Sequence, residues 1–403
     1  MTRYFIADVE LDPDTDAGQE RLGHAHRTSE RVVCACSGAT RPQMYIAKIN
    51  GAYFLKRMPD TGFEHAPECV SFMPPDALTG RAGLQGSAIE EHPDDGTTLL
   101  RLGFSLSKGA GRAAPPPSDG QPATEVKTTP KKLTLTSLLH YLWEEAGLCK
   151  WAPGLEGKRN WGVVQRRLNE TALSKIAKSL PLADRLFVPE PYRHNDKAEI
   201  AVRRAGTFRR MAAKPNSYGL LIAEYKSHEP TRIGARFTFK HLPDQPFFAD
   251  AEFLSRFETV SAGTLALADM IPDSHVMIIA TFQFTAQGYP VLNELGLMPV
   301  TGRWLPFDHI NDATLIDAMC DAKRSFIKSL RYNMGHDAPL AAMMTTDLDQ
   351  AVLMFIEHGV SHTQSEGATD FGIEGHGLRS WVWPAYAAMP ALPDAPYIRT
   401  AAT

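Results

Sequence analysis

The stretch Met44-Tyr-Ile-Ala-Lys-Ile-Asn-Gly-Ala-Tyr-Phe-Leu-Lys56 decides how the first part of this chain folds. Two β-rich runs flank Asn50-Gly51, and Asn-Gly is the strongest two-residue hairpin signal because both turn positions need positive φ. The sequence therefore predicts a β-hairpin. Because a hairpin returns the chain, the segment before it and the segment after it should lie side by side.

Four potential metal ligands lie in those two segments. Cys34 and Cys36 precede the hairpin, and His65 and Cys69 follow it. Three thiolates and one imidazole form a Cys₃His set, which zinc favours where it holds a fold together. Four protein ligands leave no open position for a water molecule. The sequence therefore predicts a structural zinc site rather than a catalytic one.

These cysteines could instead be packed free thiols that bind no metal. Cysteine packs as a small hydrophobic residue, so buried free thiols are common. A disulfide is disfavoured, because a Cys-X-Cys pair bonds poorly and the N-terminus shows no apolar secretory signal. The spacing Cys-X-Cys followed by His-X₃-Cys is not a standard finger spacing, so the type of module is open. We interpret Cys149 and Cys320, which stand alone, as packed thiols.

Length and composition indicate a soluble protein of several units. The chain has 403 residues, of which 43% are hydrophobic and 22% charged, as is usual for globular proteins. No stretch approaches the ~20 apolar residues of a membrane span. We therefore expect a cytoplasmic protein with no membrane partner, in a reducing setting where thiols bind metal more often than they pair.

The charge is unevenly distributed. Residues 126–214 hold 18 Lys and Arg against 8 Asp and Glu, whereas residues 1–125 hold 12 against 17 and residues 215–403 hold 12 against 21. A basic middle block indicates a nucleic-acid or other polyanionic partner. On charge alone, a solvated cationic face explains it equally well.

Two helices are predicted in the basic block, over residues 133–147 and 161–180. The second carries four basic residues among its polar positions, and they are our candidate nucleic-acid contacts: Arg166, Arg167, Lys175 and Lys178. Two helices joined by a turn resemble a helix-turn-helix or winged-helix arrangement. The alternative is an ordinary amphipathic helix with Lys and Arg facing solvent.

The remaining chain alternates strands and helices. We expect strands at 199–203, 218–226, 235–240, 275–284 and 289–295, and helices at 250–259, 312–333 and 347–357. Strands with inserted helices favour an α+β or mixed-sheet domain.

One motif in this domain could carry catalysis. The apolar strand ending in Glu224-Tyr-Lys226 should project both charged groups from one face, because residues two apart on a strand share a face. PD-(D/E)XK nucleases use such a pair with an upstream acid, which here would be Asp196 or Glu199, to hold Mg²⁺ and orient the attacking water. The alternative is a solvated ion pair at a strand end.

The composition predicts four segments in an α+β chain. These are a zinc-binding β-hairpin module at 1–105, a flexible Pro/Gly-rich linker at 106–130, a basic helical segment at 131–185 and a mixed-sheet domain at 186–403.

The early Cys-X-Cys and His-X-Pro-X-Cys, the Leu-Leu-His-Tyr-Leu-Trp helix and the Lys-His-Leu-Pro-Asp-X-Pro-Phe-Phe turn resemble an uncharacterised bacterial family, family 1173 of the domains of unknown function. The resemblance covers most of the chain. It implies a setting on plasmids and integrative elements, and it implies no activity.

Three functions follow from these observations. The leading hypothesis is a zinc-stabilised, nucleic-acid-associated protein of mobile elements. The enzyme alternative is an Mg²⁺-dependent nuclease centred on Glu224 and Lys226. The third is a scaffold that binds a protein partner through the zinc module.

Overall fold

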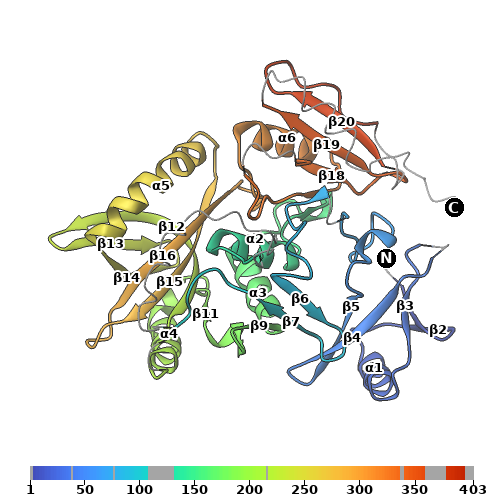
Figure 1. The fold of residues 1–403 in the computed structure, drawn as a ribbon, viewed down its shortest axis with the longest axis horizontal. Coiled ribbons are helices and arrows are strands. Elements are labelled where there is room, and N and C mark those ends of the chain that lie inside the picture. Colours follow the sequence, from blue (N-terminus) through green and yellow to red (C-terminus); the bar gives the residue numbers. More distant parts are fainter. Residues whose placement is uncertain are drawn as a thin grey trace, which may run out of the picture.

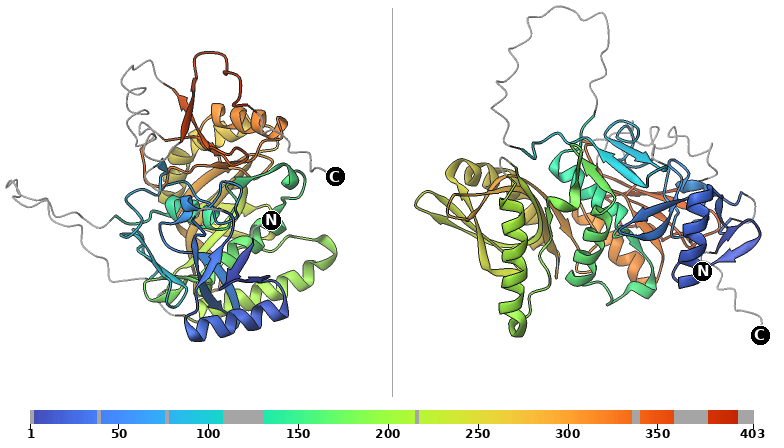
Figure 2. Two further views of the ribbon diagram at one scale, coloured as in Figure 1. Left: turned by 90° about the vertical axis from the view of Figure 1, so that its right-hand side faces the viewer. Right: turned by 90° about the horizontal axis from the view of Figure 1, so that it is seen from below.

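A computed structural model describes seven parts of the chain, residues 3–37, 40–75, 78–107, 131–214, 217–335, 340–358 and 378–394. These parts form a mixed α+β fold with six α-helices and four sheets. Two helices lie between a β-barrel-like sheet on one side and the N-terminal sheet on the other (Figures 1 and 2).

The N-terminal sheet is built on the expected hairpin. Its strand order is β2-β1-β3-β4-β5, formed by β1 (Tyr4–Ile6), β2 (Val9–Leu11), β3 (Val32–Cys34), β4 (Gln43–Ile49) and β5 (Ala52–Arg57). Asn50 and Gly51 form the turn with φ of 50° and 86°, the positive values that a two-residue hairpin requires. Helix α1 (Asp16–Thr28) begins at the capping residue Thr15 and is tied to β5 by hydrogen bonds between Gln19 and Tyr53.

Two further sheets join parts of the chain that are far apart in sequence. One has the order β10-β9-β7-β6 and consists of β6 (Ile89–His92), β7 (Thr97–Leu100), β9 (Lys175–Ala177) and β10 (Leu180–Pro181). The other has the order β20-β19-β18-β17-β8 and consists of β8 (Lys150–Trp151), β17 (Phe326–Lys328), β18 (Met343–Thr345), β19 (Val352–Glu357) and β20 (Arg379–Pro384). The segment 131–185 thus shares one sheet with 1–105 and another with 186–403. The expected linker at 106–130 lies outside the described residues except for 106 and 107.

Helices α2 (Leu135–Glu145) and α3 (Trp161–Ala172) occupy the centre of the fold. Thr134 caps α2, and nine of its eleven residues, Leu135 and Ser137 through Glu144, are buried. The expected second helix at 161–180 is wrong beyond Ala172. Residues 175–177 instead form β9, which pairs in parallel with β7.

The fourth sheet closes on itself. Its order is β11-β12-β13-β14-β16-β15, with a further pairing between β12 and β15. Its strands are β11 (Leu186–Phe187), β12 (Gly219–Thr231), β13 (Gly234–Phe239), β14 (Leu242–Asp250), β15 (His275–Phe284) and β16 (Pro290–Val300). Helices α4 (Lys197–Ala212) and α5 (Ala251–Asp269) share its phenylalanine-rich core.

Three expected elements have the wrong type or length. Residues 199–203 lie in α4 rather than in a strand, because Ile200, Arg204, Phe208 and Met211 are buried at helical spacing. The helix expected at 312–333 is α6 (Ile310–Asp321), after which the chain enters strand β17. Residues 352–357 of the helix expected at 347–357 are strand β19.

Candidate metal centre

The hairpin brings the two pairs of potential ligands together. Cys34 ends β3, whose residues Val32 and Val33 pair with the start of β4. The start of β4 in turn faces the end of β5, with Met44 opposite Arg57. The chain therefore leaves β5 at the same end of the sheet as Cys34. The following 3-10 turn, Gly62–Glu64, places His65 there, and Cys69 follows it.

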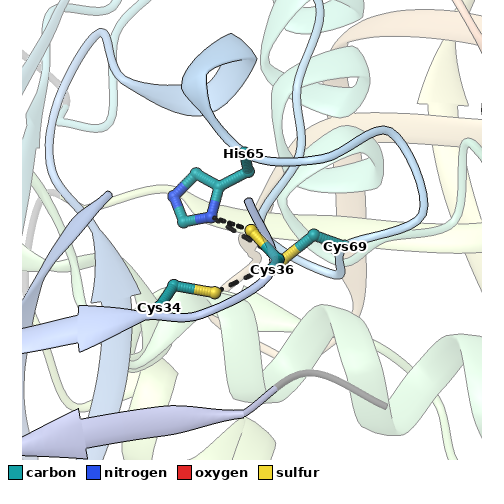
Figure 3. Close-up of side chains that lie close together, drawn as sticks. All are labelled: Cys34, Cys36, His65 and Cys69. Atoms are coloured by element: carbon teal, nitrogen blue, oxygen red, sulfur yellow. Dashed lines mark hydrogen bonds between the residues drawn. The ribbon is translucent and has the colours of Figure 1, made fainter. Parts of the chain in front are cut away.

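The four side chains point toward one common centre (Figure 3). The Sγ atoms of Cys34 and Cys69 are 3.7 Å apart, and Nδ1 of His65 is 3.4 Å from Sγ of Cys36 and 3.6 Å from Sγ of Cys69. All four potential ligand atoms lie within 4.8 Å of one another. Within the described ranges, no other group of three or more His, Cys, Asp or Glu residues has this geometry.

These distances match a tetrahedral site. Zinc–sulfur bonds of about 2.3 Å and zinc–nitrogen bonds of about 2.0 Å place tetrahedral ligands about 3.8 Å apart for two sulfurs and about 3.5 Å apart for sulfur and nitrogen. The cysteines are free rather than oxidised. The spacing is therefore that of ligands around one ion.

The surroundings suit thiolates that are bound to a cation. The backbone N–H of Ala66 donates to Sγ of Cys36 at 3.3 Å, and that of Ser71 donates to Sγ of Cys69 at 3.4 Å. Without a cation, burial raises the pKa of the Cys34 and Cys36 thiols, and the charge of the nearby Cys69 thiolate raises both pKa values further. A metal ion reverses this preference because it stabilises the thiolate directly.

His65 faces the cluster through Nδ1. Its ring is buried, and Nε2 has no hydrogen-bond partner among the residues that the structure describes. Nδ1 is therefore the ring nitrogen that could bind a metal ion. Tyr4, opposite Cys34 in the β1–β3 pair, is a neighbour that the sequence did not indicate; burial, followed by the nearby thiols, raises its pKa to about 12.

The residues proposed for catalysis do not share one face. The register between β12 and β13 shifts between Tyr225 and Ser227, so Lys226 lies in a β-bulge and is exposed, whereas Glu224 is 2% exposed. The rule that residues two apart on a strand point together fails at a bulge. The expectation that Glu224 and Lys226 project together is therefore wrong.

Glu224 has other partners instead. It forms an ion pair with Lys240, and Nδ1 of His275 lies 2.6 Å from its Oε1. Burial opposes ionisation of Glu224, but the hydrogen bonds from His275 and Lys240 outweigh it and lower its pKa. Lys240 and His275 are contributed by the β13–β14 turn and β15, so no local motif could have indicated them.

The two upstream acids lie at the start of α4. Asp196 lies 3.8 Å from Arg193, and Glu199, whose side chain is 77% exposed, lies 3.9 Å from Arg203. No hydrogen bond or ion pair joins either acid to Glu224 in the described part of the chain.

The four candidate nucleic-acid contacts have different environments. Arg166 and Arg167 are exposed on α3, where Arg166 lies 3.9 Å from Glu170. Lys175 is in β9, buried, and forms an ion pair with Glu145 at 2.9 Å. Lys178 follows β9 and donates to the carbonyl of Phe104 at 3.0 Å. The four residues therefore do not form one helical face, because α3 ends before Lys175.

The fold and the site define an α+β protein with a buried Cys₃His cluster. The chain belongs to the family described as "Protein of unknown function (DUF1173)", whose match spans residues 4–385. No curated protein and no solved structure matches it. None of the helices in the described ranges could cross a membrane.

Proposed function

We propose that this protein binds one zinc ion as a structural element, through Cys34, Cys36, His65 and Cys69. The agreement between the observed ligand-to-ligand distances and a tetrahedral S₃N site supports this proposal. The zinc would hold the end of the β4–β5 hairpin and the following loop against β3. Because all four ligands come from the protein, the zinc would stabilise the fold and would not take part in a reaction.

Metal analysis of the purified full-length chain tests this proposal. We expect one zinc per chain, with X-ray absorption showing about three sulfurs near 2.3 Å and one nitrogen near 2.0 Å. Cys36→Ala should lose the metal, and Cys320→Ala, which removes a thiol elsewhere, should retain it. A protein that folds without stoichiometric metal would contradict the proposal.

A second proposed function is nucleic-acid association through α4. One face of α4 is buried, and the other presents exposed Lys197, Arg209 and Arg210. No carboxylate forms an ion pair with these three residues within the described parts of the chain. Exposed basic side chains that form no ion pair with an acid can bind a phosphate backbone. The setting on bacterial mobile elements remains part of this proposal, and it rests on the family resemblance alone.

A salt series tests the second function. DNA affinity should fall steeply as salt rises, and the double variant Arg209→Ala, Arg210→Ala should weaken binding and reduce the salt slope by about 2. The matched control is the pair Arg232→Ala, Arg256→Ala, which removes two exposed arginines outside α4. Equal loss in both double variants excludes α4 as the contact. No affinity at all favours the protein-scaffold alternative.

The structure supplies no observation that favours the Mg²⁺ nuclease alternative. Glu224 is occupied by Lys240 and His275, and Lys226 lies in the bulge.

A further inference from the structure

A cavity of about 510 Å³ lies beside the loop that carries Cys69. Its walls come from the β4–β5 hairpin, residues 70–73 of that loop, the end of α2, Lys150, α3 and β9. Seven lysine and arginine residues line it against three glutamates, which leaves a formal excess of four positive charges.

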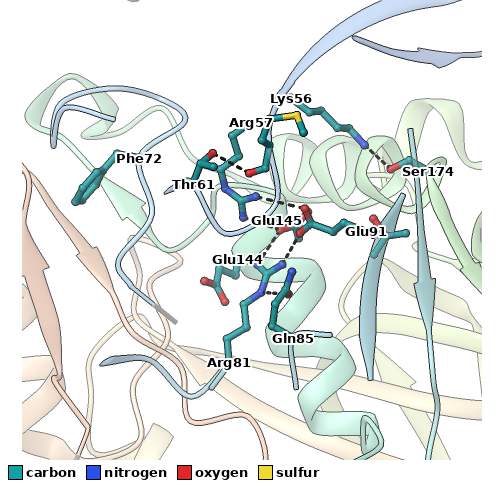
Figure 4. Close-up of polar contacts among 12 residues, drawn as sticks. Lys56, Arg57, Thr61, Phe72, Arg81, Gln85, Glu91, Glu144, Glu145 and Ser174 are labelled. Atoms are coloured by element: carbon teal, nitrogen blue, oxygen red, sulfur yellow. Dashed lines mark hydrogen bonds and ion pairs between the residues drawn. The ribbon is translucent and has the colours of Figure 1, made fainter. Parts of the chain in front are cut away.

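Part of this charge is neutralised inside the protein (Figure 4). Glu145 accepts from Arg81 at 3.0 Å and from Lys175 at 2.9 Å, and Glu91 accepts from Arg81 at 2.8 Å. Arg57 lies 3.6 Å from Glu91 and 3.9 Å from Glu145. These five side chains form one network in which every acid has cationic partners.

Three other cations at the cavity have only neutral partners. Nζ of Lys56 donates to Oγ of Ser174 at 2.9 Å and to the carbonyl of Gly96 at 3.4 Å. Nζ of Lys150 donates to the carbonyls of Val70 at 2.5 Å and Phe72 at 2.7 Å. The Arg159 guanidinium donates to the carbonyls of Gly147, Leu148 and Lys150.

None of these three cations forms an ion pair with a carboxylate in the part of the chain that the structure describes. Each also keeps at least one N–H that these bonds do not use, since an ammonium has three donors and a guanidinium five. Burial lowers the pKa of Lys56 and of Lys150 to about 8 and that of Arg159 to about 10. Withdrawing charges from water without a counter-charge is unfavourable, so the cavity is prepared for an anion.

We propose that this cavity binds a phosphate monoester such as a nucleotide, with its phosphate at Lys56, Lys150 and Arg159. A phosphate monoester carries about −1.5 to −2 charges at pH 7, which suits several uncompensated cations better than a single carboxylate does. Leu55, Met73 and Val163 add apolar wall for the organic part of the ligand. The volume is in the usual range for small-molecule sites, about 300–1,000 Å³.

The cavity and the metal loop are physically connected. Nζ of Lys150 donates to the carbonyls of Val70 and Phe72, which follow Cys69 in the loop, and Lys150 also lines the cavity. The loop therefore positions one of the phosphate-binding groups. Binding should be strongest in the metal-loaded protein, and the experiment uses that form.

Calorimetry with three probes on the metal-loaded full chain tests the proposal. AMP should bind and raise the melting temperature, inorganic phosphate should bind more weakly, and adenosine, which lacks the phosphate, should not bind at comparable concentration. The proposal is overturned if neither AMP nor phosphate binds at millimolar concentration, or if adenosine binds as tightly as AMP.

Single variants locate the site. Lys56→Met and Lys150→Met should each weaken AMP binding about tenfold or more, because each removes a charge-assisted hydrogen bond. Lys48→Met, at an exposed position on the same hairpin, is the matched control and should bind as wild type does. Lys56→Met removes a half-buried charge that forms no ion pair among the described residues, so the variant should fold. Undiminished AMP binding in both cavity variants would overturn the assignment.

The α4 double variant separates this site from nucleic-acid association. Arg209→Ala, Arg210→Ala should leave AMP binding unchanged, because neither residue lines this cavity. Loss of AMP binding in that variant would contradict the cavity site. Loss of DNA binding alone would leave the cavity site intact and support the α4 function.

Discussion

The cysteine cluster and the Glu224 cluster are both buried groups of ionisable side chains, but they differ in charge balance. Glu224 has Lys240 and His275 as partners, so its negative charge is compensated inside the protein. The thiols of Cys34, Cys36 and Cys69 lie against one another and against His65. The Glu224 cluster therefore holds charges of both signs, whereas the cysteine cluster gains thiolate charge only when a cation binds.

This difference distinguishes a structural ion pair from a ligand site. A cluster whose charges balance needs no external ion, and its main effect is on the free energy of unfolding. An uncompensated cluster is unfavourable until an ion of opposite sign binds. By the same criterion, the cavity at Lys56 and Lys150 is a ligand site like the cysteine cluster. The ion that it would bind is an anion, whereas the cysteine cluster would bind a cation.

The largest expected effect comes from removing one metal ligand. Cys69→Ala should abolish metal binding and lower the free energy of unfolding by about 4 kcal/mol or more, because metal-binding energy contributes to folding. Chemical denaturation with and without a chelator measures this. Cys320→Ala should show a smaller loss and the same chelator response as wild type. If chelation leaves the free energy of unfolding of the wild type unchanged, the cysteine cluster needs no metal ion, just as the Glu224 cluster needs none.

Breaking the compensated cluster should have a smaller effect that does not involve metal. Glu224→Gln should lower the free energy of unfolding by about 2 kcal/mol at pH 7, because Lys240 and His275 lose a buried partner. Since its pKa is lowered in the folded protein, Glu224 stabilises above its unfolded pKa, and this contribution disappears as pH falls. The difference between wild type and variant should therefore shrink toward acidic pH, with metal content unchanged.

The cavity lysines predict a pH dependence of the same sign as that of Glu224, but in an alkaline window. Both have a folded pKa of about 8, below that of an unfolded lysine. The unfolded chain therefore binds more protons between about pH 8 and pH 10, and stability contributed by these residues rises with pH in that window. Lys56→Met should reduce this rise by about 1 kcal/mol. Saturating AMP should flatten the same rise, because the bound phosphate favours the charged lysines.

The smallest expected effect is at Lys226. Its side chain is exposed in the bulge, so Lys226→Ala should change the free energy of unfolding by less than about 0.5 kcal/mol. Comparison with Glu224→Gln under identical denaturation conditions measures the contrast. Equal effects at the two positions would indicate that Lys226 assists Glu224 after all.

The sequence predicted the cysteine cluster because its geometry depends on local features. Asn50-Gly51 determines the turn, the turn determines the register of β4 and β5, and the register returns the chain to Cys34. Each step involves neighbouring residues, for which sequence rules are strongest.

The remaining features depend on contacts between distant segments. A bulge displaces Lys226, and a parallel pairing with β7 ends the helical pattern near Lys175. Lys56 and Lys150 look like ordinary surface lysines in the sequence. Their burial depends on how the hairpin, α2 and the Cys69 loop pack, which periodicity cannot indicate.

The pairing of β8 with β17 has a consequence for synthesis in the cell. Lys150 lies opposite Ile327, so β8 emerges from the ribosome long before its partner strand exists. At about 5–20 residues per second, the interval is on the order of 10 to 35 s. During that time the nascent chain carries β8 without the strand that it pairs with in the folded protein.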